Sequence, residues 1–303
     1  MAGVLLTIQN KQNRKNVFPV TALLGGAAIW GLLWYPYRLL EQAEISGSIA
    51  TAITYFIALL LGLAVFRNNL RGTQIFGGEP QLLLWIGLCA GWTNLAYVLG
   101  VVHGEVMRVL LLFYLAPLWT ILFARFLLNE KLSLHGYLVI ALSLAGAATM
   151  LGQAERGFSL PSSYGDWMGL SAGFMFALSN VLSRKDQHHN IQLKSLAVWM
   201  GVTLIGFIYS LFLHDLSLLG NISGNSYMLL LGLGIVVFGL SVLVQYGLTH
   251  VPANQAIVIM LFELVVAAGA AYLLTDEAMT SREWIGGAMI VSASLFSAKM
   301  NRE

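Results

Sequence analysis

Apolar runs of about 20 residues, separated by short polar joints, recur along the whole chain. A helix of about 20 residues matches the ~30 Å hydrocarbon core of a bilayer. The alternating short segments of a membrane β-barrel are absent from the sequence. The pattern therefore predicts an all-α membrane protein with ten transmembrane helices. The ten runs lie at about 17–40, 47–66, 82–102, 106–128, 134–151, 165–183, 195–213, 227–248, 251–274 and 282–298.

Composition supports a membrane location. Of 303 residues, 58% are hydrophobic and 10% are charged, whereas soluble domains carry roughly 25% charged residues. The first run is too long for the apolar core of a cleaved signal peptide, and it contains Trp30, Trp34 and Pro36. The single cysteine, Cys89, excludes an intrachain disulfide and a thiolate metal cluster.

The second half of the chain repeats the plan of the first half. An apolar run, a short polar joint and a second apolar run extend over 105–150 and again over 252–297. A constant offset of 147 residues, held over about 60 residues, indicates an internal duplication. The matched pairs at this offset include Arg108 with Gln255, Pro117 with Leu264, Leu128 with Thr275, and Glu130 with Glu277.

Basic residues predict the orientation. If the N-terminus is cytoplasmic and the runs alternate, 12 of the 16 lysines and arginines lie inside, and this bias places both termini in the cytoplasm. Five spans in each half make the second half enter the membrane from the opposite side. Inverted five-helix repeats are typical of alternating-access carriers; the alternative is a duplication that serves helix packing alone.

The predicted organisation has five parts. They are a cytoplasmic N-terminal tail (1–16), a first repeat with helices 1–5 (17–151), an external linker (152–164), an inverted second repeat with helices 6–10 (165–298), and a cytoplasmic C-terminal tail (299–303).

The first span carries aromatic residues on one face. Trp30, Trp34 and Arg38 are spaced four residues apart, and at an offset of 146 they match Phe176, Asn180 and Arg184. The face forms either an interfacial aromatic belt or the lining of a cavity, and the nearby Pro36 favours the cavity. Arg38 and Arg184 are candidate gate residues or headgroup anchors.

Polar side chains recur at matched depths in the third and eighth spans. Asn94 and Tyr97 lie on nearly one face of the third span, and Gln245 and Tyr246 lie in the eighth. A buried amide in a span needs a partner. These residues either bond neighbouring helices or line a shared cavity.

The fourth and ninth spans contain the remaining candidates. Arg108 lies about two residues inside the fourth span, followed by Tyr114 and by Pro117, which removes a backbone donor and indicates a helix break. Glu263 is the only acidic residue in the middle of any predicted span. A carboxylate there is costly unless it is paired, wetted or protonated, so Glu263 is either a functional ligand or proton site, or a structural hydrogen-bonding group.

The sequence lacks the motifs of several kinds of enzyme and nucleotide-binding protein. The chain has no phosphate-binding Gly-Lys loop and no His-Glu-x-x-His. We therefore expect no enzyme activity, no cofactor, no metal and no nucleotide or nucleic-acid partner. The pair His188–His189 is interpreted as part of a solvated loop, because only Asp186 accompanies it.

Three segments resemble a known transporter family. Ala28-Ile-Trp-Gly, Leu115-Ala-Pro-Leu-Trp and Leu128-Asn-Glu-Lys-Leu-Ser are similar to the EamA repeat of the drug/metabolite transporter superfamily. The second copy departs from the pattern, with Leu264 for the proline and Glu277-Ala-Met-Thr for the joint. Among the members of the family, the YddG-type exporters of aromatic amino acids are the most similar.

The resemblance implies a secondary transporter in a bacterial inner membrane, monomeric or homodimeric, that exports a small molecule from a cavity between the repeats. Aromatic or other neutral amino acids are the expected substrates. The alternatives are a broader drug or metabolite exporter and a channel-like facilitator. The expected substrate-binding residues are Trp30, Trp34, Asn94, Tyr97, Arg108, Tyr114, Asn180, Gln245, Tyr246 and Glu263; the expected helix-break or gating residues are Pro36, Pro117, Arg38 and Arg184.

Overall fold

The computed structural model describes residues 2–69, 76–104, 106–151, 161–212, 223–274, 280–297 and 300, and every regular element among them is a helix. The elements are α1 (Ala2–Gln42), α2 (Gly47–Phe66), η1 (Arg67–Asn69), α4 (Pro80–His103), α5 (Val106–Phe113), α6 (Ala116–Leu127), α7 (Leu134–Leu151), α8 (Tyr164–Lys185), α9 (Ile191–Phe212), α10 (Gly224–His250), α11 (Ala253–Met260), α12 (Phe262–Leu274) and α13 (Ser281–Phe296).

Helix lies at every one of the ten apolar runs expected from the sequence, so the all-helical prediction is confirmed for the described residues. Within the described part of the chain, six segments are long and apolar enough to cross a membrane, and three shorter apolar helices accompany them. Two runs are each divided into a pair of helices, α5 with α6 and α11 with α12. The number of membrane crossings and their orientation stay predictions.

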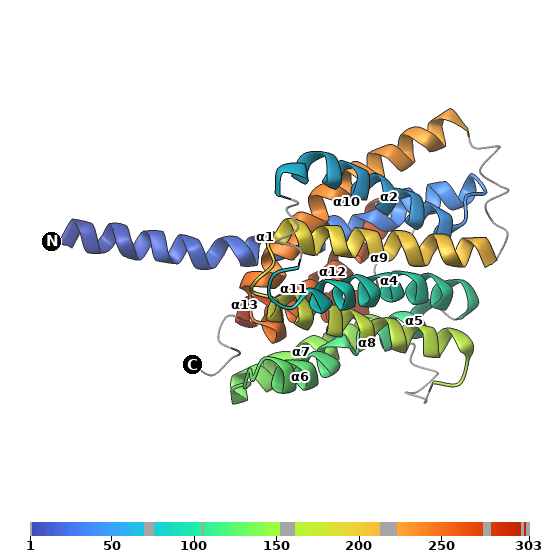
Figure 1. The fold of residues 1–303 in the computed structure, drawn as a ribbon. Helices are drawn as coiled ribbons and strands as arrows, with labels where there is room; N and C mark the ends of the chain where they lie inside the picture. The colour runs from blue at the N-terminus through green and yellow to red at the C-terminus, as the bar shows by residue number, and fades with distance from the viewer. Residues whose placement is uncertain are drawn as a thin grey trace.

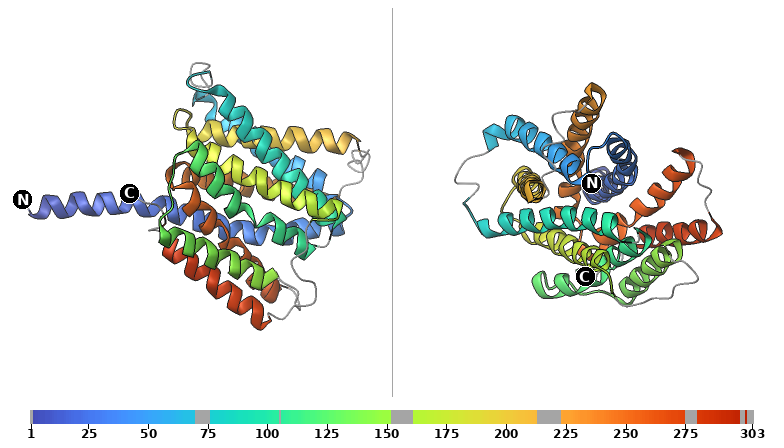
Figure 2. Two further views of the ribbon diagram at one scale, coloured as in Figure 1. Left: turned by 90° about the horizontal axis from the view of Figure 1, so that it is seen from below. Right: turned by 90° about the vertical axis from the view of Figure 1, so that its right-hand side faces the viewer.

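The helices form a bundle, and the first and last described parts of the chain lie at the same end of it (Figure 1). The first half of α1 projects from that end, and Figure 2 shows the projection from two further sides. The C-terminal segment is tied to the bundle there, because the Ser133 N–H and hydroxyl both donate to the Met300 carbonyl, at 2.9 and 2.8 Å. Below, this end is called the termini end.

The two halves of the chain interlock through their first helices. Helix α8, which opens the second half, packs against α4, α5 and α6 of the first half. Conversely, α1 packs against α10, α11 and α12 of the second half. The first helix of each half therefore packs mainly against helices of the other half, so the halves share one interface instead of forming separate domains.

Glycine permits the closest of these contacts. A Cβ atom on Gly173 of α8 would overlap the backbone of Phe113, with the Phe113 Cα and carbonyl carbon both 3.0 Å away. A Cβ atom on Gly31 of α1 would lie 2.7 Å from the Glu263 carbonyl oxygen. Small residues let helix backbones approach each other within a bilayer, and here they bring α8 onto the end of α5 and α1 onto the start of α12.

An aromatic cluster fills the core between α2, α9 and α10. Trp199 is fully buried. Its ring lies 6.4 Å from that of Phe66 and 5.3 Å from that of Phe238. Dense packing of large side chains gives the bundle dispersion energy that lipid contacts alone do not replace.

The loop between α8 and α9 is anchored by a buried lysine. Lys194 has no solvent exposure. Its Nζ donates to the carbonyls of Ser183 and Asp186 and, at 3.2 Å, to the Thr249 hydroxyl. The bond to Ser183 measures 2.8 Å. Three acceptors compensate the cost of burying the ammonium group.

His189 departs from the sequence-based interpretation of a solvated loop. Its side chain is 4% exposed, and Nδ1 lies 2.8 Å from Asp186 Oδ2. The same carboxylate accepts the N–H groups of His188 and His189 through Oδ1. Asp186 thus folds the loop back on itself and draws one of the two histidines inside, a pairing that spacing alone does not reveal.

Replacing Gly173 with alanine tests the helix contact. The added Cβ meets backbone atoms that have no room to move, so we expect a loss of about 1–3 kcal/mol in stability, measured as a lower midpoint of thermal unfolding in detergent. Gly239→Ala is the matched control, because nothing lies within 4 Å of its Cβ position. Equal midpoints for the two variants would contradict the close contact of α8 with α5.

Replacing Lys194 with methionine tests the buried anchor. The substitution keeps the length of the side chain but leaves the acceptors of the loop without a donor, which costs about 2–3 kcal/mol. Lys185→Met changes an exposed lysine at the end of the neighbouring helix and serves as the control. An unfolding midpoint for Lys194→Met equal to that of Lys185→Met would rule out the anchoring role.

Candidate functional site

A break in each half of the chain divides what would otherwise be one long helix. The break between α5 and α6 falls at Tyr114 and Leu115, and the break between α11 and α12 falls at Leu261. Helices α5 and α11 contain 8 residues each. Their bounds differ by 147, the offset that relates the two halves in the sequence. The breaks are therefore equivalent features of the two repeats.

Proline explains the first break but not the second. Pro117 lies in the first turn of α6, where it donates no hydrogen bond to the Phe113 carbonyl. Leu115 N–H instead bonds the Leu112 carbonyl at 3.3 Å, a tighter turn than α-helix. In the second half Leu264 occupies the position of the proline, and its N–H bonds the Leu261 carbonyl at 3.1 Å.

The two breaks face each other across a small pocket in the bundle. Residues of both repeats line it: Phe113, Tyr114, Ala116 and Pro117 from the first, and Phe176, Ile257, Met260, Leu261 and Glu263 from the second. The pocket has room for about one water molecule. Binding of a larger molecule therefore requires the walls to move apart.

Aromatic rings surround the one carboxylate of this pocket. The rings of Tyr97, Tyr114 and Phe176 each lie within 5.1–5.4 Å of the Phe113 ring. The Tyr114 hydroxyl hydrogen-bonds the Glu263 carboxylate, and Tyr97 lies close enough to interact with that charge. Glu263 is half-buried in the first turn of α12. A helix N-terminus stabilises a negative charge.

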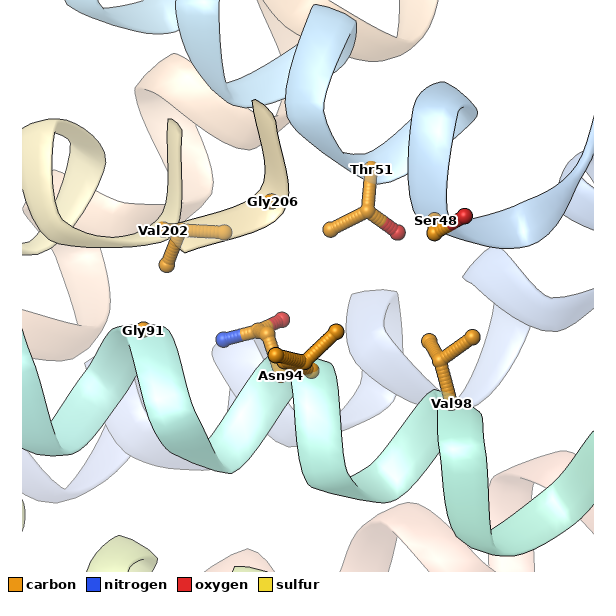
Figure 3. Close-up of a pocket in the computed structure, with 8 residues that line it drawn as sticks. Ser48, Thr51, Gly91, Asn94, Val98, Val202 and Gly206 are labelled. Atoms are coloured by element: carbon orange, nitrogen blue, oxygen red, sulfur yellow. The ribbon is translucent and has the colours of Figure 1, made fainter. Parts of the chain in front are cut away.

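Asn94 lies in a second pocket, separate from Glu263. This pocket is formed by α2, α4 and α9 and is drawn in Figure 3. The Asn94 side-chain amide donates to the Ala90 carbonyl of its own helix at 2.9 Å. Asn94 and Tyr97, expected on nearly one face, thus have different surroundings, because Asn94 lines this pocket and Tyr97 packs against Phe113. The residues of this pocket are Ser48, Thr51, Gly91, Asn94, Leu95, Val98, Val202 and Gly206.

The aromatic residues predicted in α1 and α10 lie outside both pockets. Trp30 packs against the apolar core of α1, α2, α9 and α10. Trp34 contacts Tyr35 edge to face at 5.7 Å, and its buried indole N–H has no hydrogen-bond partner among the described residues. The Tyr246 ring lies 5.3 Å from the ring of Phe18 in α1.

Two predicted amides are buried without full hydrogen bonding. Asn180 is 6% exposed and Gln245 is 5% exposed. Within the described part of the chain, the Asn180 side-chain N–H₂ and the Gln245 side-chain carbonyl have no hydrogen-bond partner. Each such atom costs about 1–3 kcal/mol when no water or ligand satisfies it.

The predicted gate and break residues differ in their local structure and contacts. Helix α1 continues without interruption through Pro36, whereas α6 begins beside Pro117. Arg38 is exposed near the end of α1. The Arg184 guanidinium donates to the Thr249 carbonyl at 2.5 Å. The side chain of Arg108 lies outside the described part of the structure.

Glu130, which the sequence marked only as part of the repeated joint, makes contacts across the halves. Its Oε2 accepts the Ala253 N–H at 3.2 Å, and its Oε1 lies 3.8 Å from Arg184 Nε. Burial raises the pKa of the Glu130 carboxyl, and the Arg184 charge and the N–H groups of Ala253 and Asn254 oppose that rise. The sequence signal that could have pointed to Glu130 is its position as a polar residue in a joint that recurs in both halves.

Comparisons with known proteins agree with this architecture. The model of the EamA-like transporter family matches residues 17–152 and again 163–298. An uncharacterized transporter of Archaeoglobus fulgidus is 28% identical over 245 residues, which cover 80% of this chain and 84% of the relative. The uncharacterized transporter YojE of Bacillus subtilis is 26% identical over 242 residues, 75% of each chain.

A solved crystal structure shares the fold. It superposes with a TM-score of 0.75 at 17% sequence identity, and the match covers 92% of this chain and 95% of that one. At this identity the likeness concerns the fold alone.

The family match covers both halves of the chain and falls on the two sets of helices that the breaks relate to each other. Apolar helices long enough to cross a bilayer make up much of the bundle. The chain is a multi-pass membrane protein that belongs to the EamA-like transporter family, with two EamA repeats.

Proposed function

We propose that this transporter exports aromatic and other neutral amino acids across a bacterial inner membrane, with both termini in the cytoplasm. The observation that supports the proposal most is the pocket between the helix breaks, where aromatic rings surround a single carboxylate. Substrate sites between inverted repeats are commonly built from such broken helices.

The pocket offers a complement to each part of an aromatic amino acid. The rings of Phe113, Tyr114 and Phe176 supply surfaces on which a substrate ring packs. The Glu263 carboxylate is an acceptor for the ammonium group. The first turns of α6 and α12 begin at the breaks. Pro117 has no N–H, and the N–H groups of Leu118 and Leu264 bond the carbonyls of Leu115 and Leu261, so the positive ends of the two helix dipoles are the groups that favour the substrate carboxylate.

Transport requires this pocket to open alternately to each side. In the present conformation it has room for about one water molecule, so we interpret this conformation as a closed state. The breaks at Tyr114 and Leu261 lie in the middle of two spans. Movement of the half-helices about these points widens the pocket without unfolding either span.

A general drug or metabolite exporter is the second candidate. Aromatic rings around a carboxylate also suit an apolar organic cation, and the same pocket residues serve both substrates. Competition between substrates separates the two, because a cation lacking the amino-acid carboxylate competes strongly only in the second case. A channel-like facilitator differs from both by unsaturable flux.

Uptake by proteoliposomes tests the substrate class. Purified protein is expected to give saturable uptake of radiolabelled phenylalanine, reduced by unlabelled tryptophan and less by threonine, because the pocket favours rings. Empty liposomes are the control. Absence of uptake for every amino acid tested, together with saturable uptake of an aromatic cation, would replace the amino-acid assignment with the drug exporter.

Glu263→Gln tests the role of the carboxylate. We expect phenylalanine uptake to fall at least tenfold, because the amide does not hold the ammonium charge. Loss only in the presence of a pH gradient identifies Glu263 as a proton site, and loss under both conditions identifies it as a substrate ligand. Glu41→Gln changes an exposed carboxylate near the end of α1 and is the control. Unchanged uptake by Glu263→Gln under both conditions would exclude both roles.

A further inference from the structure

Four elements meet at the termini end around one carboxylate from the first half. Glu130 follows α6, where Asn129 adopts a left-handed φ of 56° and the Glu130 N–H bonds back to the Ala124 carbonyl at 3.1 Å. Asparagine tolerates that conformation better than most residues. The turn directs the Glu130 side chain onto the first turn of α11.

Glu130 caps a helix of the opposite repeat. Its Oε2 lies 3.2 Å from the Ala253 nitrogen, and the Asn254 N–H is a second donor. These groups have no acceptors within α11, because they lie in its first turn. A carboxylate here satisfies orphan donors and interacts favourably with the helix dipole.

Arg184 extends the contact to α10. Its Nε lies 3.8 Å from Glu130 Oε1 and its Nη1 donates to the Thr249 carbonyl at 2.5 Å. The Arg184 and Glu130 side chains are 28% and 16% exposed. The Thr249 hydroxyl in turn accepts from the buried Lys194. One residue of the first half is thereby joined to α8, α9, α10 and α11 of the second.

Helix α11 links this cluster to the pocket between the breaks. Its first turn is capped by Glu130, and its other end contributes Ile257 and Met260 to the pocket. Eight residues of α-helix extend only about 12 Å. A displacement of the capped end therefore moves the pocket wall.

Two buried amides lie one helical turn away from residues that line the pocket. Asn180 lies one helical turn from Phe176, which lines the pocket, and Asn254 lies one turn from Ile257. Val181 and Ala253, their sequence neighbours, pack in one apolar cluster, so α8 and α11 run together here. Asn254 is 1% exposed, and neither polar atom of its side chain has a hydrogen-bond partner among the residues that the structure describes.

We propose that Glu130, Arg184 and the first turn of α11 form the cytoplasmic gate of the transporter, closed in this structure over a passage lined by the amides of Asn180, Gln245 and Asn254. The inference rests on the proposed alternating-access function. Opening separates Glu130 from α11, and water or the polar groups of the substrate then satisfy the amides. Breaking one contact between repeats exposes the route to the pocket.

Cysteine accessibility tests the gate without any substrate. The parent protein is Cys89→Ala with Asn180→Cys as the reporter, since Cys89 is the only native cysteine. A membrane-impermeant maleimide is applied to the cytoplasmic face of inside-out vesicles. We expect Glu130→Ala to raise the labelling rate at least tenfold. Glu130→Gln, which keeps an acceptor but loses the charge, gives an intermediate increase.

Glu79→Ala is the matched control. It removes an exposed carboxylate at the start of α4, next to the loop between α8 and α9 that follows Arg184. A labelling rate within twofold of the parent for folded Glu130→Ala overturns the proposal, and so does an increase seen only from the external face. If Glu130→Ala does not fold, the same criteria apply to Glu130→Gln.

The two proposals fail in different ways. If labelling responds to Glu130 but no amino acid is transported, the gate stands and the substrate assignment is wrong. If phenylalanine is transported by the wild-type protein but labelling does not respond, the gate is wrong and the carrier assignment stands.

Discussion

Close backbone contact between the halves is the constraint on which this structure depends. Gly173 lets α8 rest on the Phe113 carbonyl, and Gly31 lets α1 rest on the Glu263 carbonyl. Both contacts lie at the helix breaks, and each joins one repeat to the other. Because lipid offers little hydrophobic drive for helix association, van der Waals contact at small residues has to hold the bundle together. The same contacts position the walls of the pocket.

The repeat is the part of the architecture that the sequence predicted best. Helix occupies each apolar run, since membrane spans have a strong and local signal in their length and hydrophobicity. The break beside Pro117 was also expected, because proline removes a donor. The equivalent break at Leu261 has no proline, so only the 147-residue offset could have located it.

Side-chain partners were harder to predict. The helical spacing places Asn94 and Tyr97 on nearly one face, yet Asn94 lines a pocket with residues of α2 and α9, whereas Tyr97 packs against Phe113. Lys194 directly precedes the predicted span 195–213, and its side chain is fully buried among three acceptors. Glu130 belonged to a recognisable joint, but its contact with α11 depends on the exchange of helices between repeats. Such long-range pairings leave no local pattern.

The central claim is that substrate binds between the two helix breaks. An experimental structure determined with bound tryptophan tests it most directly. The account predicts density for the indole ring against Tyr114 and Phe176, with the ammonium group beside Glu263 and both half-helices displaced outward. Density in the pocket of Ser48, Thr51 and Asn94, with the space beside Glu263 still closed, would contradict it.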